Sequence, residues 1–288
     1  MKKLESAEIA EFVAKLNKEE ENYTGFVGTE EEEILHYLIN EFESLDSSFC
    51  VEKEADGIKA IIGAEIFNDK TGEVWGPFIA DEGENKFLEF LWNDFIEKIP
   101  KDTESLSFYF SKVNKKSEKL CKAIKASRKK EHYILIAKKE SFKACADNEY
   151  IDTLNEQDYI EFADLHDKIF PKTYYSGRQI VERISEENVV FVFKQKRVRG
   201  YIYIEASKEF DEASIEFLGV DSEFRNHGIG SQLLQHALKW VFQDKKISKA
   251  YLSVNSENAN ALSLYEAAGF ELQHHMVNYL KEAPFELI

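Results

Sequence analysis

The first pattern that could do chemistry lies in residues 220–234. Arg225, Gly228 and Gly230 follow a β-rich segment and lead into a predicted helix over 230–243. Glycines at such a point let the backbone approach a ligand closely, and the first N–H groups of a helix bind anions. An arginine there can also donate two hydrogen bonds to phosphate oxygens. The pattern predicts a pyrophosphate-binding loop, although glycines that simply begin a helix would look the same.

A second pattern covers residues 255–270. It follows a predicted strand and indicates a helix with Asn258 at its N-cap and Gly269 just past its end. Leu264 falls on the apolar stripe of this helix, and Tyr265 lies beside it. The simplest interpretation of Tyr265 is a half-buried core tyrosine, but a phenol near a reacting group can also supply a proton.

Other chemistries find little support. No third glycine after Gly230 completes a dinucleotide-binding fingerprint, and no GxxxxGK[ST] loop occurs. The three cysteines are too few and too widely spaced for a disulfide framework or a zinc knuckle. His274 and His275 are adjacent and cannot face one ligand from a strand, so we expect no metal cofactor. His166 and His236 fall on predicted helices and are expected to be surface residues or hydrogen-bonded core residues.

Together the two patterns resemble the GCN5-related N-acetyltransferase (GNAT) superfamily. The residues that carry the resemblance are Arg225-x-x-Gly228-x-Gly230 and Asn258-x-x-Ala261-x-x-Leu264-Tyr265-Glu266-x-x-Gly269-Phe270. In element order the resemblance covers residues 150–281. It implies an α/β domain with a mixed, mostly antiparallel sheet flanked by helices. It also implies acetyl-CoA as cosubstrate and direct transfer of an acetyl group to an amine.

The resemblance also implies a role for each matching residue. The acyl-CoA contacts would come from Leu218, Gly219, Val220, Arg225, Asn226, His227, Gly228, Ile229, Gly230, Ser231 and Asn258. The first three would offer backbone groups of a splayed strand to the pantetheine arm. The loop that follows would wrap the pyrophosphate, chiefly through main-chain N–H groups, and Asn258 would contact the pantetheine. Tyr265 would lie near the thioester sulfur and protonate the departing thiolate.

The general base is a separate question. Glu216 alternates with Ile215 and Phe217, so its side chain is expected to leave the strand face that those two occupy. The resemblance implies a carboxylate at this place, acting on the acceptor amine directly or through water. A Glu216 paired with a neighbouring base or with solvent is an equally open alternative. Glu205 is a weaker candidate for the same role.

The acceptor amine would meet a different segment. In this superfamily acceptor selection comes from the first two helices of the domain and their loop, which here covers residues 170–177 (FPKTYYSG). Tyr174 and Tyr175 could wall a pocket and hold an amine by cation–π contact. Aromatic residues that simply pack the loop are the alternative.

The elements that must position these residues occur in the same order in both halves: helices, three strands, helix, strand, helix, strand. In the first half we predict helices over 29–42, 85–99 and 115–130, after a helical start, and strands over 49–53, 58–67, 73–80, 105–110 and 132–137. In the second half we predict helices over 158–169, 177–184, 230–243 and 258–268, and strands over 189–193, 200–205, 214–220, 249–254 and 275–280. This order indicates an internal duplication.

The two halves differ in their chemistry. Residues 81–86 (DEGENK) stand where the second half has its Arg225 loop, and they contain neither an arginine nor paired glycines. We therefore expect residues 1–145 to form a degenerate GNAT-like domain without an acyl-CoA motif. Residues 146–288 are expected to form the catalytic domain. The lysine-rich stretch over 112–130 is expected to be a solvated helix face, with a patch for nucleic acid or an acidic partner as the alternative.

Charge restricts the partners. The chain of 288 residues carries 37 Lys and Arg against 54 Asp and Glu, a net charge of −17 that divides almost evenly between the halves. Such a surface repels phosphate backbones and anionic lipids, which argues against nucleic-acid and membrane-surface binding. It favours a cationic acceptor. No secretory h-region and no apolar stretch of about 18 residues is present, so a cytoplasmic protein is expected.

The function these patterns predict is acetyl-CoA-dependent N-acetyl transfer to a primary amine of a small molecule or peptide. The alternative is a non-catalytic CoA-binding sensor or scaffold, for which Tyr265 would be dispensable. The identity of the acceptor and the oligomeric state are not encoded in any pattern that we find.

Overall fold

The computed structural model describes residues 2–42, 44–80, 84–143, 146 and 148–288. The chain forms two compact units, Met1–His132 with His274–Ile288, and Tyr133–Gln273. This division differs from the boundary at residue 145 that the sequence led us to expect. The reason is strand pairing: β5 (Ser127–Lys138) runs across the boundary, and the last strand, β11 (Glu271–Glu282), pairs with a strand of the first unit.

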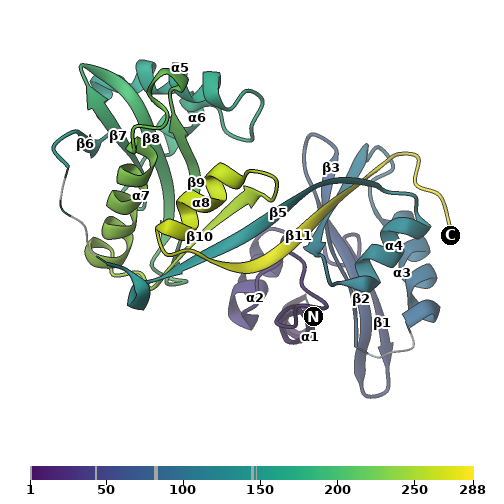
Figure 1. Cartoon of the computed structure of the whole chain (residues 1–288). Coiled ribbons are helices and arrows are strands. Elements are labelled where there is room, and N and C mark those ends of the chain that lie inside the picture. The colour runs from purple at the N-terminus through teal and green to yellow at the C-terminus, as the bar shows by residue number, and fades with distance from the viewer. Residues whose placement is uncertain (1, 43, 81–83, 144–145, 147) are drawn as a thin grey trace. The chain divides into compact units, whose positions relative to one another are not determined.

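The first unit is a mixed sheet between two helical layers. Its elements are α1 (Lys2–Asn17), α2 (Glu31–Asn40), β1 (Phe49–Glu54), β2 (Gly57–Ile66), β3 (Thr71–Ile79), α3 (Glu84–Lys98), β4 (Ser105–Ser111) and α4 (Lys115–Ala123), with the start of β5 and most of β11. All its described strand pairs are antiparallel except β3 with β4. Helices α1 and α2 cover one face and α3 and α4 the other, as Figure 1 shows.

The helix predicted over 115–130 is only partly present. Helix α4 ends at Ala123, Lys125 adopts a φ of 55°, and β5 begins at Ser127. Lysine and arginine are good helix formers, so the basic run carries no local stop signal. The segment is extended because its continuation, Leu135 to Ala137, is buried in a core as a strand.

The second unit has the same kind of architecture. Its elements are β6 (Ile151–Thr153), the 3-10 turn η2 (Glu156–Asp158), α5 (Tyr159–Ile169), α6 (Gly177–Arg183), β7 (Asn188–Gln195), β8 (Arg197–Ser207), β9 (Glu212–Val220), the 3-10 turn η3 (Ser222–Phe224), α7 (Ile229–Lys239), the π-helical turn η4 (Trp240–Asp244), β10 (Lys249–Asn255) and α8 (Ala259–Ala267). The strand order is β10-β9-β8-β7-β6, with β5 beside β10. The mixed, mostly antiparallel sheets expected for both halves are confirmed.

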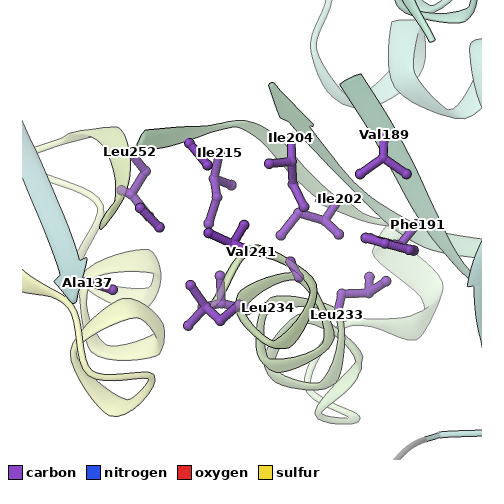
Figure 2. Packing of buried hydrophobic residues seen from close by; sticks show 14 of the residues in the cluster. Ala137, Val189, Phe191, Ile202, Ile204, Ile215, Leu233, Leu234, Val241 and Leu252 are labelled. Carbon is purple, nitrogen blue, oxygen red and sulfur yellow. The ribbon is translucent and has the colours of Figure 1, made fainter. Parts of the chain in front are cut away.

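Alternating residues of the sheet in the second unit build two cores. Phe191 of β7 and Ile202 of β8 face α7, whereas Val190 and Tyr201, their neighbours in sequence, face α5 and α6. Figure 2 shows Leu233 and other residues of α7 pointing toward this sheet. The period-two pattern of the strands therefore places α7 and α8 on one face and α5 and α6 on the other.

Both units contain a parallel strand pair that opens after its first residues. In the second unit β10 pairs with β9 only from Lys249↔Glu212 to Tyr251↔Ser214, although both strands continue. In the first unit β3 pairs with β4 only from Thr71↔Ser105 to Glu73↔Ser107. Beyond these pairs the two facing edges are not paired with each other, so their backbone groups can bind something other than a neighbouring strand.

Within the described residues, no helix is both long and apolar enough to cross a lipid bilayer.

The first unit contains a pair of carboxylates that makes its stability depend on pH. Glu65 and Glu73 lie directly opposite each other on β2 and β3, where like charges are destabilising. Burial, and then the charge of Glu65, raise the pKa of Glu73 from 4.5 to about 6. Because folding raises this pKa, the folded state binds more protons than the unfolded state. The free energy of unfolding therefore falls as the pH rises through this interval.

We expect Glu73→Gln to raise the free energy of unfolding by about 1 kcal/mol near pH 7.5, allowing for the partial exposure of the side chain. Near pH 4, where Glu73 is already protonated, the same change should have little effect. Denaturant titrations at the two pH values measure this difference. Glu54→Gln, at the exposed end of β1, is the matched control. Equal stabilisation by Glu73→Gln at both pH values would contradict the expected charge repulsion.

Candidate active site

The loop between β9 and α7 presents unpaired backbone donors. Asn226 and Gly228 have φ angles of 65° and 76°, and Gly228 is the N-cap of α7 without any capping side chain. The amides of Ile229, Gly230 and Ser231 therefore begin the helix without an acceptor inside it. In an α-helix each N–H donates to the carbonyl four residues earlier, so these first N–H groups have no partner within the helix and point outward. The helix dipole adds partial positive charge at this end. This geometry can bind an anion.

Side chains of the same loop hold its shape. Arg225 is exposed, and its Nε donates a hydrogen bond of 3.2 Å to the carbonyl of Val220. The Nδ1 of His227 lies 2.8 Å from the carbonyl of Arg225. Because a carbonyl can only accept, the imidazole is the donor in that bond. His227 therefore lies in the loop as expected, with Nε2 left for other contacts.

The two sequence patterns meet at Gly230. A Cβ built on Gly230 would lie 3.6 Å from Cδ2 of Leu264 on α8 and 3.8 Å from Cγ2 of Val220 at the end of β9. The start of α7, the end of the diverging β9 and the middle of α8 therefore converge. Leu218 and Val220 pack against the same core as Tyr265. Residues that are far apart in the chain form one site at the opening of the sheet.

Helix α8 has the boundaries that its sequence predicts. The Asn258 side chain accepts a hydrogen bond of 3.2 Å from the amide of Ala261. At the other end Gly269 has a φ of 93°, and the amide of Phe270 donates to the carbonyl of Tyr265 at 3.1 Å, which forms a Schellman motif. Asn258 is thus a capping residue whose side-chain NH₂ group can still donate a hydrogen bond.

Tyr265 combines apolar packing with an available hydroxyl. Its ring packs edge-on against Phe270 at a centroid distance of 5.8 Å. The hydroxyl makes no hydrogen bond to any residue that the structure describes. Burial raises the pKa of Tyr265 to about 12, so the hydroxyl keeps its proton at neutral pH. This is the protonation state that a proton donor requires.

The expectation about the direction of Glu216 is wrong in one respect. Tyr203 pairs with Phe217 and the next residue, Ile204, pairs with Ile215, so Glu216 is the extra residue of a β-bulge. A bulge shifts the alternation of the strand. Ile215 consequently faces α7, whereas Phe217 faces α5. Ile215 and Phe217 therefore do not share a face of the sheet from which Glu216 could point away.

A tyrosine of the α5–α6 loop covers the bulge. The hydroxyl of Tyr174 donates a hydrogen bond to Oε2 of Glu216. Its ring lies 4.9 Å from that of Phe217 and 4.8 Å from that of Tyr175, measured between centroids. The loop that the sequence predicts to contact the acceptor therefore lies beside the candidate base.

Glu205 has other partners. Its Oε1 accepts hydrogen bonds from the hydroxyl of Tyr203 at 2.6 Å and from Nε of Arg183 at 3.2 Å. The guanidinium of Arg183 in turn lies 4.4 Å from the centre of the Tyr175 ring. Glu205 is therefore engaged by a cation and a phenol, whereas Glu216 accepts a hydrogen bond from the phenol of Tyr174. The arrangement favours Glu216 over Glu205.

The remaining histidines have separate surroundings. His236 packs edge-on against Phe191 at 4.6 Å. His274 and His275 contact two different carboxylates, Glu20 at 2.5 Å and Glu131 at 2.6 Å. In the described parts of the chain no group of three or more His, Cys, Asp or Glu residues is arranged to hold a metal ion.

The first unit differs at the corresponding opening. Nζ of Lys116, on α4, donates to the carbonyl of Ile79 at the end of β3 at 2.9 Å and to Oδ1 of Asn22 at 3.1 Å. The end of β3 is thus bonded by a lysine of α4, whereas the end of β9 is bonded by Arg225 of its own loop. The acidic replacement for the loop, 81–86, lies outside the residues or side chains that the structure describes.

Three features of this site are not evident from the sequence: the bulge, the Tyr174–Glu216 hydrogen bond and the partners of Glu205. The alternation of Ala213, Ile215, Phe217 and Gly219 gives no sign of an inserted residue. The paired tyrosines in the loop were the one signal of an aromatic wall. Which carboxylate they would meet depends on the register of β8 and β9.

The uncapped start of α7 thus lies near the opening between the parallel strands β9 and β10. The sequence model of the Acetyltransferase (GNAT) family matches residues 150–270. The [ribosomal protein bS18]-alanine N-acetyltransferase of Salmonella typhimurium is 33% identical over 73 residues, which are 25% of this chain and 49% of that protein. The chain thus spans about half the length of this curated relative.

Two solved structures match nearly the whole chain in fold. A GCN5-related N-acetyltransferase from Sphaerobacter thermophilus superimposes with a TM-score of 0.72 at 16% identity, covering 99% of this chain and 95% of that one. A tandem GNAT protein from the clavulanic acid biosynthesis pathway gives a TM-score of 0.66 at 13% identity, covering 98% and 96%. Residues 150–270 therefore match the sequence model of the GNAT family, and the whole chain shares the fold of these two solved structures.

Proposed function

We propose that this protein is an acetyl-CoA-dependent N-acetyltransferase that acts on a primary amine of a small molecule or peptide. The observation that carries the proposal is the convergence at Gly230, where the anion-binding start of α7, the open edge of β9 and the helix of Tyr265 meet. Catalysis is assigned to the second unit. The sequence of residues 81–86, which has neither an arginine nor paired glycines, supports a first unit without an acyl-CoA site of its own.

The residues at the opening fit acetyl-CoA. A glycine at position 230 adds no side chain over the start of α7, and the amides of residues 229–231 suit a pyrophosphate. Arg225 and His227 would add side-chain donors, and Asn226 and Gly228 the backbone turn. Acetyl-CoA supplies the activated acetyl group when it is bound. Leu218, Gly219 and Val220 would hold its pantetheine arm through backbone groups, with Asn258 on the opposite side.

The side chains divide the proton chemistry between them. Glu216 takes a proton from the acceptor ammonium, directly or through a water molecule. Backbone N–H groups on the open edge of β9 stabilise negative charge on the acetyl carbonyl oxygen. Tyr265 gives its hydroxyl proton to the sulfur as the bond between the acetyl carbon and the sulfur breaks. The exposed ring of Tyr174 offers an aromatic surface to a cationic acceptor, whereas Arg183 already lies over the ring of Tyr175.

An amine screen tests the proposal. Purified protein is incubated with acetyl-CoA and with polyamines, aminoglycosides, amino acids or peptides with free N-termini, and thiol release and product mass are measured. We expect amine-dependent thiol release with at least one class, and a mass increase of one acetyl group in the product. Tight CoA binding without release for any amine would instead support a CoA sensor or scaffold.

The assignment of the base is tested by a matched pair of variants. We expect Glu216→Gln to lower kcat by about 100-fold, because a positioned base contributes about that much, while acetyl-CoA binding stays unchanged. Glu205→Gln should lower kcat far less, since Glu205 is already held by Arg183 and Tyr203. Steady-state kinetics and calorimetry give the two quantities. A larger loss in Glu205→Gln would transfer the role of base to Glu205.

A further inference from the structure

A buried histidine links the acceptor loop to the sheet. His166 on α5 is fully buried, with Nδ1 2.6 Å from the hydroxyl of Tyr201 and Nε2 2.8 Å from the carbonyl of Tyr175. The carbonyl can only accept, so Nε2 carries the proton and Nδ1 accepts from Tyr201. Burial lowers the pKa of His166, which favours this neutral form. Both ring nitrogens are therefore used, one on β8 and one on the loop.

The ends of the same loop are anchored independently of this ring. The amide of Gly177 donates to Oδ1 of Asp167 at 2.7 Å, and Ser176 and Gln179 form a capping box at the start of α6. A Cβ on Gly177 would lie 2.4 Å from Cα of Ala163, so α5 and α6 are in close contact there. Loss of the histidine bond would therefore release Tyr175 and its neighbours without detaching α6.

The ring of His166 also contacts the strand that carries the candidate base. It packs edge-on against Phe217 at a centroid distance of 4.8 Å and lies 5.6 Å from Phe170 at the start of the loop. Phe217 follows Glu216 in the bulge, and its ring also contacts that of Tyr174 in a tilted arrangement at 4.9 Å. The imidazole of His166 thus contacts Phe217, which follows Glu216, and is hydrogen-bonded to Tyr175, which follows Tyr174.

We propose that His166 is a positioning residue that holds the Tyr174–Tyr175 wall in register with Glu216 and so determines which acceptors bind. Only the expected change in kinetics rests on the proposed acetyl transfer. The geometric consequence, an ordered loop over 172–176, does not depend on any acceptor. Acyl-CoA binding, on the other side of the sheet opening, should not depend on His166.

Two substitutions separate the two hydrogen bonds. In His166→Gln the amide nitrogen occupies the place of Nε2 and can still donate to the Tyr175 carbonyl. In His166→Asn the side-chain oxygen occupies the place of Nδ1 and can accept from Tyr201, but the loop bond is lost. Both variants bury a polar amide of similar size, so they carry similar structural costs. Tyr201→Phe removes the bond to the sheet and keeps the ring.

Hydrogen exchange and kinetics provide separate measurements. In His166→Asn we expect amide exchange over 172–176 to be about tenfold faster, the loss expected for one buried hydrogen bond, with exchange in α7 unchanged. His166→Gln should stay close to the wild type. With the best amine from the screen, KM for the amine should rise about tenfold in His166→Asn while KM for acetyl-CoA stays constant.

Three results would overturn the proposal. The first is equal exchange over 172–176 in both variants. The second is faster exchange that extends equally into α7, which would mean a purely structural role. The third is a KM increase shared by amine and acetyl-CoA. If no amine is acetylated, the proposed function fails, but the exchange experiment still decides whether His166 positions the loop.

Discussion

Tyr265→Phe is expected to lower kcat by a factor of about 100 or more, while the dissociation constant for acetyl-CoA changes by less than about twofold. The ring of Tyr265 packs against Phe270, and a phenylalanine keeps that contact. Only the hydroxyl is lost, and it makes no hydrogen bond to a described residue that would be broken. The effect should therefore appear in the chemical step rather than in folding or binding. Steady-state kinetics and isothermal titration calorimetry measure the two quantities.

Tyr159→Phe is a suitable control for this experiment. Tyr159 begins α5 and packs against the core on the opposite face of the sheet. Removing its hydroxyl should leave kcat within about twofold of the wild type. If Tyr265→Phe also retains its turnover, Tyr265 is not the proton donor. The departing thiolate would then have to take its proton from water or from another residue.

The second large effect is expected at Gly230. Gly230→Leu should weaken acetyl-CoA binding by a factor of about 100, because the side chain would occupy the approach to the free amides of α7. A Cβ at this position makes ordinary contacts of 3.6 Å and 3.8 Å, so the fold itself accommodates it. Gly230→Ala should weaken binding less, and it should not lower the melting temperature, since alanine favours a helix over glycine.

Gly230 is a cleaner probe than Gly228. Gly228 has a φ of 76°, so any other residue there strains the backbone as well as filling the site. Thermal unfolding beside the binding titration separates the two effects. Unchanged acetyl-CoA affinity in Gly230→Leu, with a normal melting temperature, would mean that the pyrophosphate does not bind at the start of α7.

Several parts of the fold were predictable because they depend on near neighbours in the chain. Asn258 and Gly269 were expected to bound a helix, and both do so through hydrogen bonds to residues within five positions. The helix start at Gly228 and Gly230 is likewise a matter of local φ angles and free amides. Caps and turns of this kind are determined by residues that are close together in the sequence.

Other parts were not predictable because they depend on which strands pair. The helix predicted over 115–130 stops at Ala123, since the residues that follow become a strand whose later part is buried. The expected boundary at residue 145 does not match the compact units, since β11 pairs with β4. Both depend on contacts between residues far apart in the chain, and local propensity carries no information about those contacts.

The amino-acid sequence by itself determined the nature of the cofactor end of the site: a glycine-rich helix start with Arg225, followed by a capped helix that carries Tyr265. It also determined the acidity of both halves, against which the start of α7 must provide local positive potential. The tertiary structure decided the acceptor end. The extra residue at Glu216, the hydrogen bond from Tyr174 and the pairing of Glu205 with Arg183 follow from strand register and loop packing. A helix cap depends on dihedral angles within a few residues, whereas the neighbours of a side chain across a sheet are set only when the strands align.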